Sequence, residues 1–159
     1  MKGQGTSPEH GLVPIAKVVK KLGSREMPAI SEQATVEDAI DRMVRFPHSR
    51  LLYVVDGRRR LIGTISLENL VRHFFSHSHE PQVHPRSLLG MITTETVKDI
   101  MQSHPIFATE QEEVEGVLKK MIEKNLTEIA VVDDEERLIA DVTMLDLLSL
   151  LITEQKQTV

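Results

Sequence analysis

The sequence contains no cysteine and no tryptophan, and tyrosine occurs only once. The absence of cysteine excludes disulfides, thiolate catalysis and cysteine-based zinc sites, and it permits a reducing compartment. Aromatic residues make up only 3% of the chain, which leaves few side chains on which single-stranded nucleic acid could stack. The net charge of -5 also disfavours a nucleic-acid partner, because binding to a phosphate backbone depends on clustered lysine and arginine.

Long apolar runs are absent as well. No stretch approaches the roughly 18 apolar residues that a membrane span requires, and the polar start at Met1-Lys2-Gly3 lacks the apolar core of a signal peptide. We therefore expect a soluble, cytoplasmic protein with no membrane partner. Hydrophobic residues, mostly leucine, isoleucine and valine, still make up 40% of the chain, which predicts an aliphatic core rather than disorder.

The sequence also lacks the common catalytic motifs. It has no glycine-rich phosphate loop, no Gly-x-Ser-x-Gly and no His-Glu metal helix. The acidic run from Asp133 to Glu136 lies in a predicted turn, where its carboxylates stay solvated and their acidities remain untuned. These absences predict a protein without catalytic activity.

The main feature that the sequence does contain is an internal repeat. A shift of roughly 77 positions aligns Leu61-Ile62 with Leu138-Ile139 and the two occurrences of Val-Val-Asp, which end at Asp56 and Asp133. At 159 residues, the chain is long enough for two small halves that pack intimately and are not stable alone.

Each half predicts the same order of elements: strand, helix, strand, strand, helix. We expect the first half at 28–31, 35–45, 51–56, 61–65 and 67–75, and the second at 106–108, 112–124, 129–133, 138–142 and 144–152. A short amphipathic helix within 12–22 precedes the first half, and a helical turn at 96–101 precedes the second. The expected organisation is a flexible tail (1–11), a first repeat (12–76), a linker (77–93), a second repeat (94–153) and a second tail (154–159).

The best candidate site is the junction between the last strand and the last helix. Thr143 occupies the expected N-cap position, and Asp146 follows one turn later on the same side of the helix. A hydroxyl, free backbone amides and a carboxylate can together hold a sugar phosphate. The alternative is a plain helix cap that contributes about 1 kcal/mol to stability and binds nothing.

With Val-Val-Asp, a charged turn, Leu-Ile and then Ser66 or Thr143 before Asn69 or Asp146, each half resembles a cystathionine-beta-synthase (CBS) domain. Two in tandem resemble a Bateman module. The resemblance implies an α/β fold of two repeats packed about a pseudo-twofold axis, and a non-catalytic regulatory function. It also implies up to two sites for adenosine-containing ligands in the cleft. The motif aspartate, Asp146, would bind the ribose hydroxyls, and Thr143 would contact ribose or phosphate; Ser66 and Asn69 hold the same positions in the first repeat.

Departures from the family pattern narrow the expected ligand. The amide of Asn69 has one acceptor oxygen where a carboxylate has two, so we expect the first site to be weaker or empty. The basic residue common three positions before Val-Val-Asp is replaced by Leu51 and Glu128, and Arg50 is the only nearby cation in the sequence. A triphosphate such as ATP is therefore less favoured as a regulatory ligand than AMP or S-adenosylmethionine; ADP is also possible, and no cofactor is obligatory.

Two further hypotheses remain open. The chain can instead be a ligand-free interaction module that forms a homodimer and docks to an unidentified protein partner, using an apolar helix face at Leu147, Leu148, Leu150, Leu151 and Ile152. The histidines at positions 73, 77, 79 and 84 could form a surface site for zinc or nickel. Without a closed ligand geometry, we favour a histidine-rich linker that binds no metal.

Overall fold

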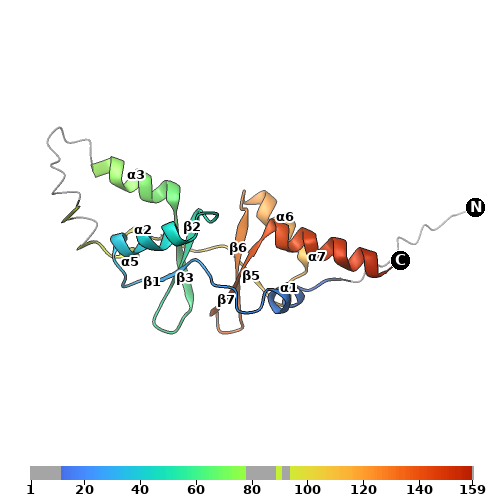
Figure 1. The fold of residues 1–159 in the computed structure, drawn as a ribbon. Coiled ribbons are helices and arrows are strands. Elements are labelled where there is room, and N and C mark those ends of the chain that lie inside the picture. Colours follow the sequence, from blue (N-terminus) through green and yellow to red (C-terminus); the bar gives the residue numbers. More distant parts are fainter. Residues whose placement is uncertain (1–11, 78–88, 91–93, 159) are drawn as a thin grey trace, which may run out of the picture.

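The computed structural model describes residues 12–77, 89–90 and 94–158 and contains two sheets, each flanked by helices (Figure 1). The first half consists of β1 (Ala29–Ser31), α2 (Val36–Arg45), β2 (Leu51–Val55), β3 (Leu61–Ser66) and α3 (Leu67–His77). The second half consists of β5 (Phe107–Thr109), α6 (Val114–Glu123), β6 (Glu128–Val132), β7 (Leu138–Thr143) and α7 (Met144–Gln157). The predicted order of elements is confirmed in both halves.

The two sheets share one pairing pattern. In each, the first strand runs parallel to the second, and the second pairs antiparallel with the third. The register is also repeated, because Leu51 faces Ser66 in the first sheet and Glu128 faces Thr143 in the second. This register places the ends of β3 and β7, where the motif residues lie, at equivalent positions.

The two hairpin turns are held by the aspartates of the Val-Val-Asp motifs. Asp56 Oδ1 accepts hydrogen bonds from two backbone N–H groups of its turn, and its Oδ2 pairs with Arg60 Nε at 2.8 Å. Asp133 makes the equivalent bonds in the second turn, with Arg137 Nε at 2.8 Å. These two aspartates therefore have a structural role, because their hydrogen bonds fix the hairpin turns.

Two helices outside the repeated unit are exchanged between the halves. α1 (Ile15–Leu22) precedes the first half but packs in the core of the second, where Ile15 is fully buried. α5 (Val97–Ile100) precedes the second half but packs in the core of the first through Val97. Because each half takes part of its core from the other's flanking segment, the halves depend on each other.

Backbone hydrogen bonds anchor the exchanged segments in matching ways. The N–H of Ile15 donates to the carbonyl of Glu112 at 2.8 Å, and the N–H of Val97 donates to the carbonyl of Ala34 at 2.8 Å. The bonds are related by the same pseudo-twofold symmetry as the strands, so the exchange is a symmetric feature of the fold.

The two sheets meet through an apolar cluster of Tyr53, Leu61, Ala130, Val132 and Leu138, all buried. Next to it, the turns bond reciprocally: the N–H of Leu61 donates to the carbonyl of Glu136, and the N–H of Leu138 donates to the carbonyl of Arg59, both at 3.0 Å. This reciprocal pair marks the pseudo-twofold axis between the halves.

One asymmetry explains a sequence difference between the repeats. The two-residue strand β4 (Gln102–Ser103), which the sequence did not predict, pairs with β3 at Gly63. A Cβ atom at Gly63 would lie 2.7 Å from the carbonyl oxygen of Gln102 and 2.7 Å from Met101 Sδ. No strand pairs with β7 on the corresponding side of the second sheet in the described residues, and there the position is Ala140. Glycine is therefore retained where a neighbouring strand approaches closely.

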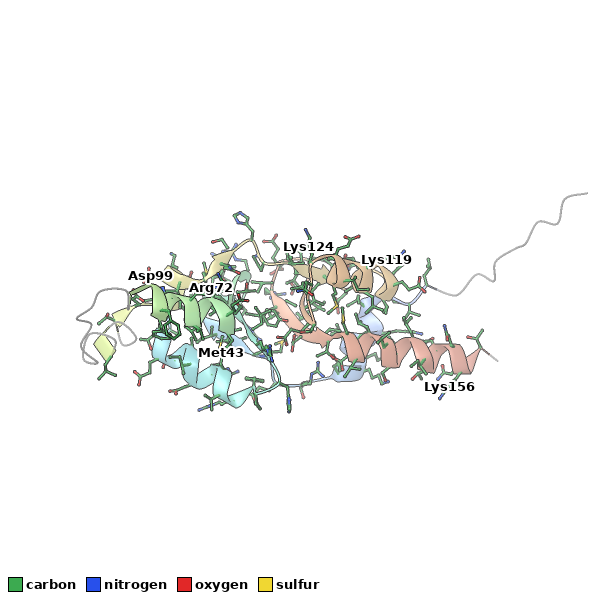
Figure 2. The ribbon with its side chains drawn as sticks, turned by 90° about the horizontal axis from the view of Figure 1, so that it is seen from above. Met43, Arg72, Asp99, Lys119, Lys124 and Lys156 are labelled. Atoms are coloured by element: carbon green, nitrogen blue, oxygen red, sulfur yellow. The ribbon has the colours of Figure 1, made fainter. Side chains whose placement is uncertain are left out.

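The helices lie in two pairs, with α2 beside α3 over one half and α6 beside α7 over the other (Figure 2). Figure 1 shows that α3 and α7 begin near the middle of the molecule and run outward in opposite directions. The N-terminal ends of both helices therefore face the boundary between the halves. None of the helices in the described ranges is long and apolar enough to cross a membrane.

Candidate functional site

Thr143 and Asp146 form a reciprocal capping box at the start of α7. The hydroxyl of Thr143 accepts a hydrogen bond from the N–H of Asp146 at 3.2 Å, and Asp146 Oδ2 accepts one from the N–H of Thr143 at 2.8 Å. The predicted N-cap at Thr143 is thus confirmed. The box fixes both side chains at the helix end that faces the first half.

The carboxylate of Asp146 also binds a cation that the sequence did not single out. Arg25 lies between α1 and β1, and its Nη2 and Nη1 atoms are 2.8 Å and 3.3 Å from Oδ2 and Oδ1 of Asp146. Nη2 also donates to the carbonyl oxygen of Asp141 at 2.6 Å. Arg25 and Asp146 are separated by 121 positions in the chain, so no local motif could have indicated the pair.

The salt bridge shifts the pKa values of Arg25 and Asp146 in opposite directions. Burial opposes ionisation of Asp146, but hydrogen bonds from Arg25 and Thr143 bring its pKa below the ordinary value. The hydrogen bond to Asp146 raises the pKa of Arg25, although partial burial opposes this change. Asp146 is therefore a charged acceptor at neutral pH.

Two further carboxyl groups of the second half accept hydrogen bonds from the first half. Asp141 Oδ1 accepts a 2.6 Å hydrogen bond from the hydroxyl of Tyr53, and Glu128 Oε1 accepts one of 2.7 Å from the hydroxyl of Ser49. Burial raises the pKa of Glu128 to about 7, and burial also raises the pKa of Asp141. The second half thus contributes three carboxyl groups to this boundary, and Arg25 binds one of them, the carboxylate of Asp146.

The equivalent position in the first half has fewer hydrogen bonds. The hydroxyl of Ser66 accepts a hydrogen bond from the N–H of Asn69 at 3.1 Å. Among the described residues, the side chain of Asn69 makes no return bond to Ser66, and no arginine binds it. The first position therefore has a helix cap without the carboxylate of the second.

The CBS domain family matches residues 19–76 and 97–153, the two halves seen in the structure. The chain belongs to the CBS domain family. The expected tandem pair is confirmed, and the two halves are CBS repeats.

Relatives of known sequence or structure agree with this assignment. The chain is 24% identical over 139 residues to an uncharacterized protein of Methanocaldococcus jannaschii, covering 86% of this chain and 49% of that protein. It thus spans about half the length of this curated relative.

Two CBS structures with bound ligands share the fold. The structure of CBSX2 from Arabidopsis thaliana, in complex with AMP, has a TM-score of 0.64 at 18% identity, covering 91% of this chain and 94% of that one. The CBS domain pair of protein MJ0100, in complex with 5′-methylthioadenosine and S-adenosyl-L-methionine, has a TM-score of 0.63 at 20% identity, covering 90% and 98%. At these identities the similarity establishes the fold of the CBS pair.

Arg50, the cation expected from the sequence, lies at the start of β2 in the first CBS repeat. Its carbonyl accepts the N–H of Leu67, and its backbone lowers the pKa of Glu128 against the larger effect of burial. Within the described part of the chain, its guanidinium forms no salt bridge. Arg25, rather than Arg50, is therefore the cation that contacts Asp146.

A groove of about 450 Å³ lies elsewhere between the CBS repeats, and it is lined by Leu61, Ile62, Ser103, His104, Pro105, Phe107, Val132 and Glu136. The four candidate ligand-binding residues, Thr143, Asp146, Ser66 and Asn69, do not line this groove. It is therefore separate from the candidate site at Thr143 and Asp146.

The metal hypothesis concerns residues that are largely outside the described ranges. His73 Nε2 lies 2.6 Å from Glu95 Oε2, whereas His79, His84 and the side chain of His77 are not in the described part of the CBS pair. Among the residues that are described, no group of three histidines or carboxylates could hold a metal ion.

Proposed function

We propose that this CBS pair is a non-catalytic regulatory module that binds an adenosine-containing ligand at Thr143 and Asp146. The observation that carries the proposal is the charged carboxylate of Asp146, fixed by the capping box at the boundary between the repeats. A carboxylate has about four acceptor positions on its two oxygens, so it can accept hydrogen bonds from both hydroxyls of a ribose. The complexes of CBSX2 with AMP and of the MJ0100 pair with adenosyl compounds support this ligand class.

The charge around the site favours a ligand with few phosphates. Asp141 and Glu128 lie on the same side of the boundary as Asp146, and Arg25 is the cation bound among them. Close approach of several phosphate charges to the ionised forms of these carboxyl groups would be repulsive. We therefore rank AMP and S-adenosylmethionine as ligands above ADP and ATP.

The first repeat supplies a weaker site in this proposal. Asn69 offers one amide oxygen where Asp146 offers a carboxylate, and hydrogen bonds to an ionised acceptor are stronger. Ser66 retains the hydroxyl, and the side chain of Arg50 is exposed nearby in the chain. Occupancy of this position would require higher ligand concentrations.

Regulation would follow from a shift between two packings of the repeats. A ligand can shift such an equilibrium only by the difference in its affinity for the two arrangements. Hydrogen bonds that cross the boundary, such as Tyr53 with Asp141 and Ser49 with Glu128, would change between the two packings.

We also place the module in the cytoplasm, since a chain without cysteine is compatible with a reducing compartment.

Isothermal titration of the purified chain with AMP, S-adenosylmethionine and ATP tests this function. In Asp146→Asn, affinity for the best ligand should fall at least about tenfold, because the ribose loses a charged acceptor. Asp38→Asn is the matched control, since Thr35 and Asp38 form the same capping box on α2, away from the boundary. Unchanged affinity in Asp146→Asn, or no binding of any of the three compounds, would contradict the proposal.

A second function, self-association, is favoured by exposed apolar residues on the helices. Leu145, Leu148 and Ile152 of α7 are 76%, 47% and 54% exposed, and Ile122 of α6 is 69% exposed. The sequence-based choice of Leu147 and Leu150 for this face was wrong, because both are buried in the core. Spacings of three, four and seven residues place the exposed side chains along one face of α7.

We propose that this face of α7 forms a symmetric homodimer contact. Light scattering after size-exclusion chromatography should give a dimer at tens of micromolar, and Leu148→Lys should shift it toward the monomer because a charge would be buried. Gln33→Lys, an exposed change in the turn after β1, is the control. A monomer in the wild type would contradict self-association and leave an unidentified protein partner to cover this face.

A further inference from the structure

Arg25 lies on the segment that crosses from one repeat to the other. α1 packs on the second repeat and ends at Gly23, where φ is 59°, and β1 belongs to the sheet of the first repeat. The side chain of Arg25 is 41% exposed, and that of Asp146 is 18% exposed. The salt bridge therefore covers much of the carboxylate while the arginine itself remains accessible.

The contacts of Arg25 use the acceptor positions that a ribose would need. Nη1 and Nη2 each donate to a different oxygen of Asp146, and the N–H of Thr143 also donates to Oδ2. Three of the roughly four acceptor positions of the carboxylate are therefore filled. A vicinal diol requires two, so both hydroxyls cannot bind while Arg25 keeps both of its bonds.

The first repeat shows that this salt bridge is not required by the fold. There, the residue at the motif position is Asn69, and the described residues place no arginine on it. Ser66 still caps α3, and the three repeated strands have the same order in the two repeats. Of the two equivalent motif positions, the one that carries a carboxylate, Asp146, is thus the one that binds an arginine.

We propose that Arg25 is an internal competitor for the ribose: it occupies the Asp146 carboxylate in the free protein, and a bound adenosyl ligand displaces it. The inference rests on the proposed function. Displacement would remove the side-chain contact between α7 and the segment between α1 and β1, which joins the two repeats, so occupancy of the site would be transmitted to their connection. The salt bridge would also weaken binding of any ligand that carries a ribose diol.

The proposal is tested by titrating adenosine, which has the diol and no charge, into the wild-type chain, Arg25→Gln and Asp146→Asn. Removing the competitor should tighten adenosine binding about two- to fivefold, the range expected for a partly exposed ion pair. Arg42→Gln is the matched control, because Arg42 binds Glu26 and the carbonyls of Met27 and Ala29 in the same segment without touching Asp146. That variant should leave the affinity unchanged.

A second measurement follows Arg25 directly. In the NMR spectrum of the wild-type chain, the Nε–H signal of Arg25 should move on addition of adenosine as the guanidinium leaves Asp146. Adenosine binding that depends on Asp146 but is unchanged or weaker in Arg25→Gln, or an unmoved Arg25 signal at saturation, would overturn the competition while leaving the proposed function intact. No binding of adenosine, AMP, S-adenosylmethionine or ATP to either the wild type or Arg25→Gln would overturn the proposed function itself.

Discussion

Tyr53 and Asp141 connect the two CBS repeats through a hydrogen bond of 2.6 Å, which the phenol of β2 donates to the carboxyl group of β7. Tyr53 is 1% exposed, and burial raises its pKa well above the ordinary value, so it remains a neutral donor. The pseudo-symmetric counterpart of Tyr53 is Ala130, which has no polar group. The contact is therefore specific to one side of the boundary.

Tyr53→Phe should destabilise the protein by about 1–3 kcal/mol, because the partly buried carboxyl group of Asp141 loses a hydrogen-bond partner. Urea denaturation of the single variants and of Tyr53→Phe/Asp141→Asn measures the coupling between the two side chains. We expect the double variant to be clearly more stable than the sum of the single effects predicts. Additive effects would show that the bond contributes nothing.

The raised pKa of Glu128 predicts a dependence of stability on pH. Its pKa is about 7 in the folded protein and 4.5 ordinarily, so the folded state binds protons more tightly than the unfolded chain between these values. This contribution to stability is therefore present at low pH, decreases as the pH rises from 4.5 to 7, and is lost above 7. Asp141, whose pKa is also raised, acts in the same direction.

Melting temperatures measured between pH 5 and pH 8 test this dependence. Glu128→Gln should flatten the profile in this range, because an amide does not titrate. Glu123→Gln, an exposed change at the end of α6, should keep the wild-type slope. An identical slope in Glu128→Gln would contradict the assignment.

Gly63→Ala should destabilise the fold by about 1–3 kcal/mol, since the added Cβ would overlap the backbone of β4 and the side chain of Met101. The reverse change at the equivalent position, Ala140→Gly, has no such overlap to relieve and should cost at most about 1 kcal/mol. Chemical denaturation of the pair provides the comparison. Equal effects would indicate that β4 does not pack closely on β3 in solution.

The exchanged helix α1 should be essential for the second repeat. Ile15→Ala should cost about 2–5 kcal/mol, because Ile15 is fully buried against the core of that repeat. Lys20→Ala, on the exposed side of α1, is the matched control and should have little effect. Hydrogen exchange should show faster exchange in β6 and β7 of Ile15→Ala than in the control; a loss confined to β2 and β3 would contradict the exchange.

The sequence by itself determined the repeated unit and most local structure. Alternating and helical patterns of apolar residues set the strands and helices, because these periodicities follow from backbone geometry alone. The cap at Thr143 and the paired hairpins were equally readable, since each depends on residues a few positions apart. The family motif also indicated Asp146 as the residue on which a ligand site would be centred.

Only the tertiary structure decided which distant segments meet. The salt bridge of Arg25 with Asp146 spans 121 positions and the bond of Tyr53 with Asp141 spans 88, so neither leaves a local pattern. The exchange of α1 and α5 and the burial of Leu147 likewise depend on contacts between segments that are distant in the sequence. An amphipathic face specifies that a helix must pack, but the partner it packs against is chosen by the competition among all apolar surfaces of the folded chain.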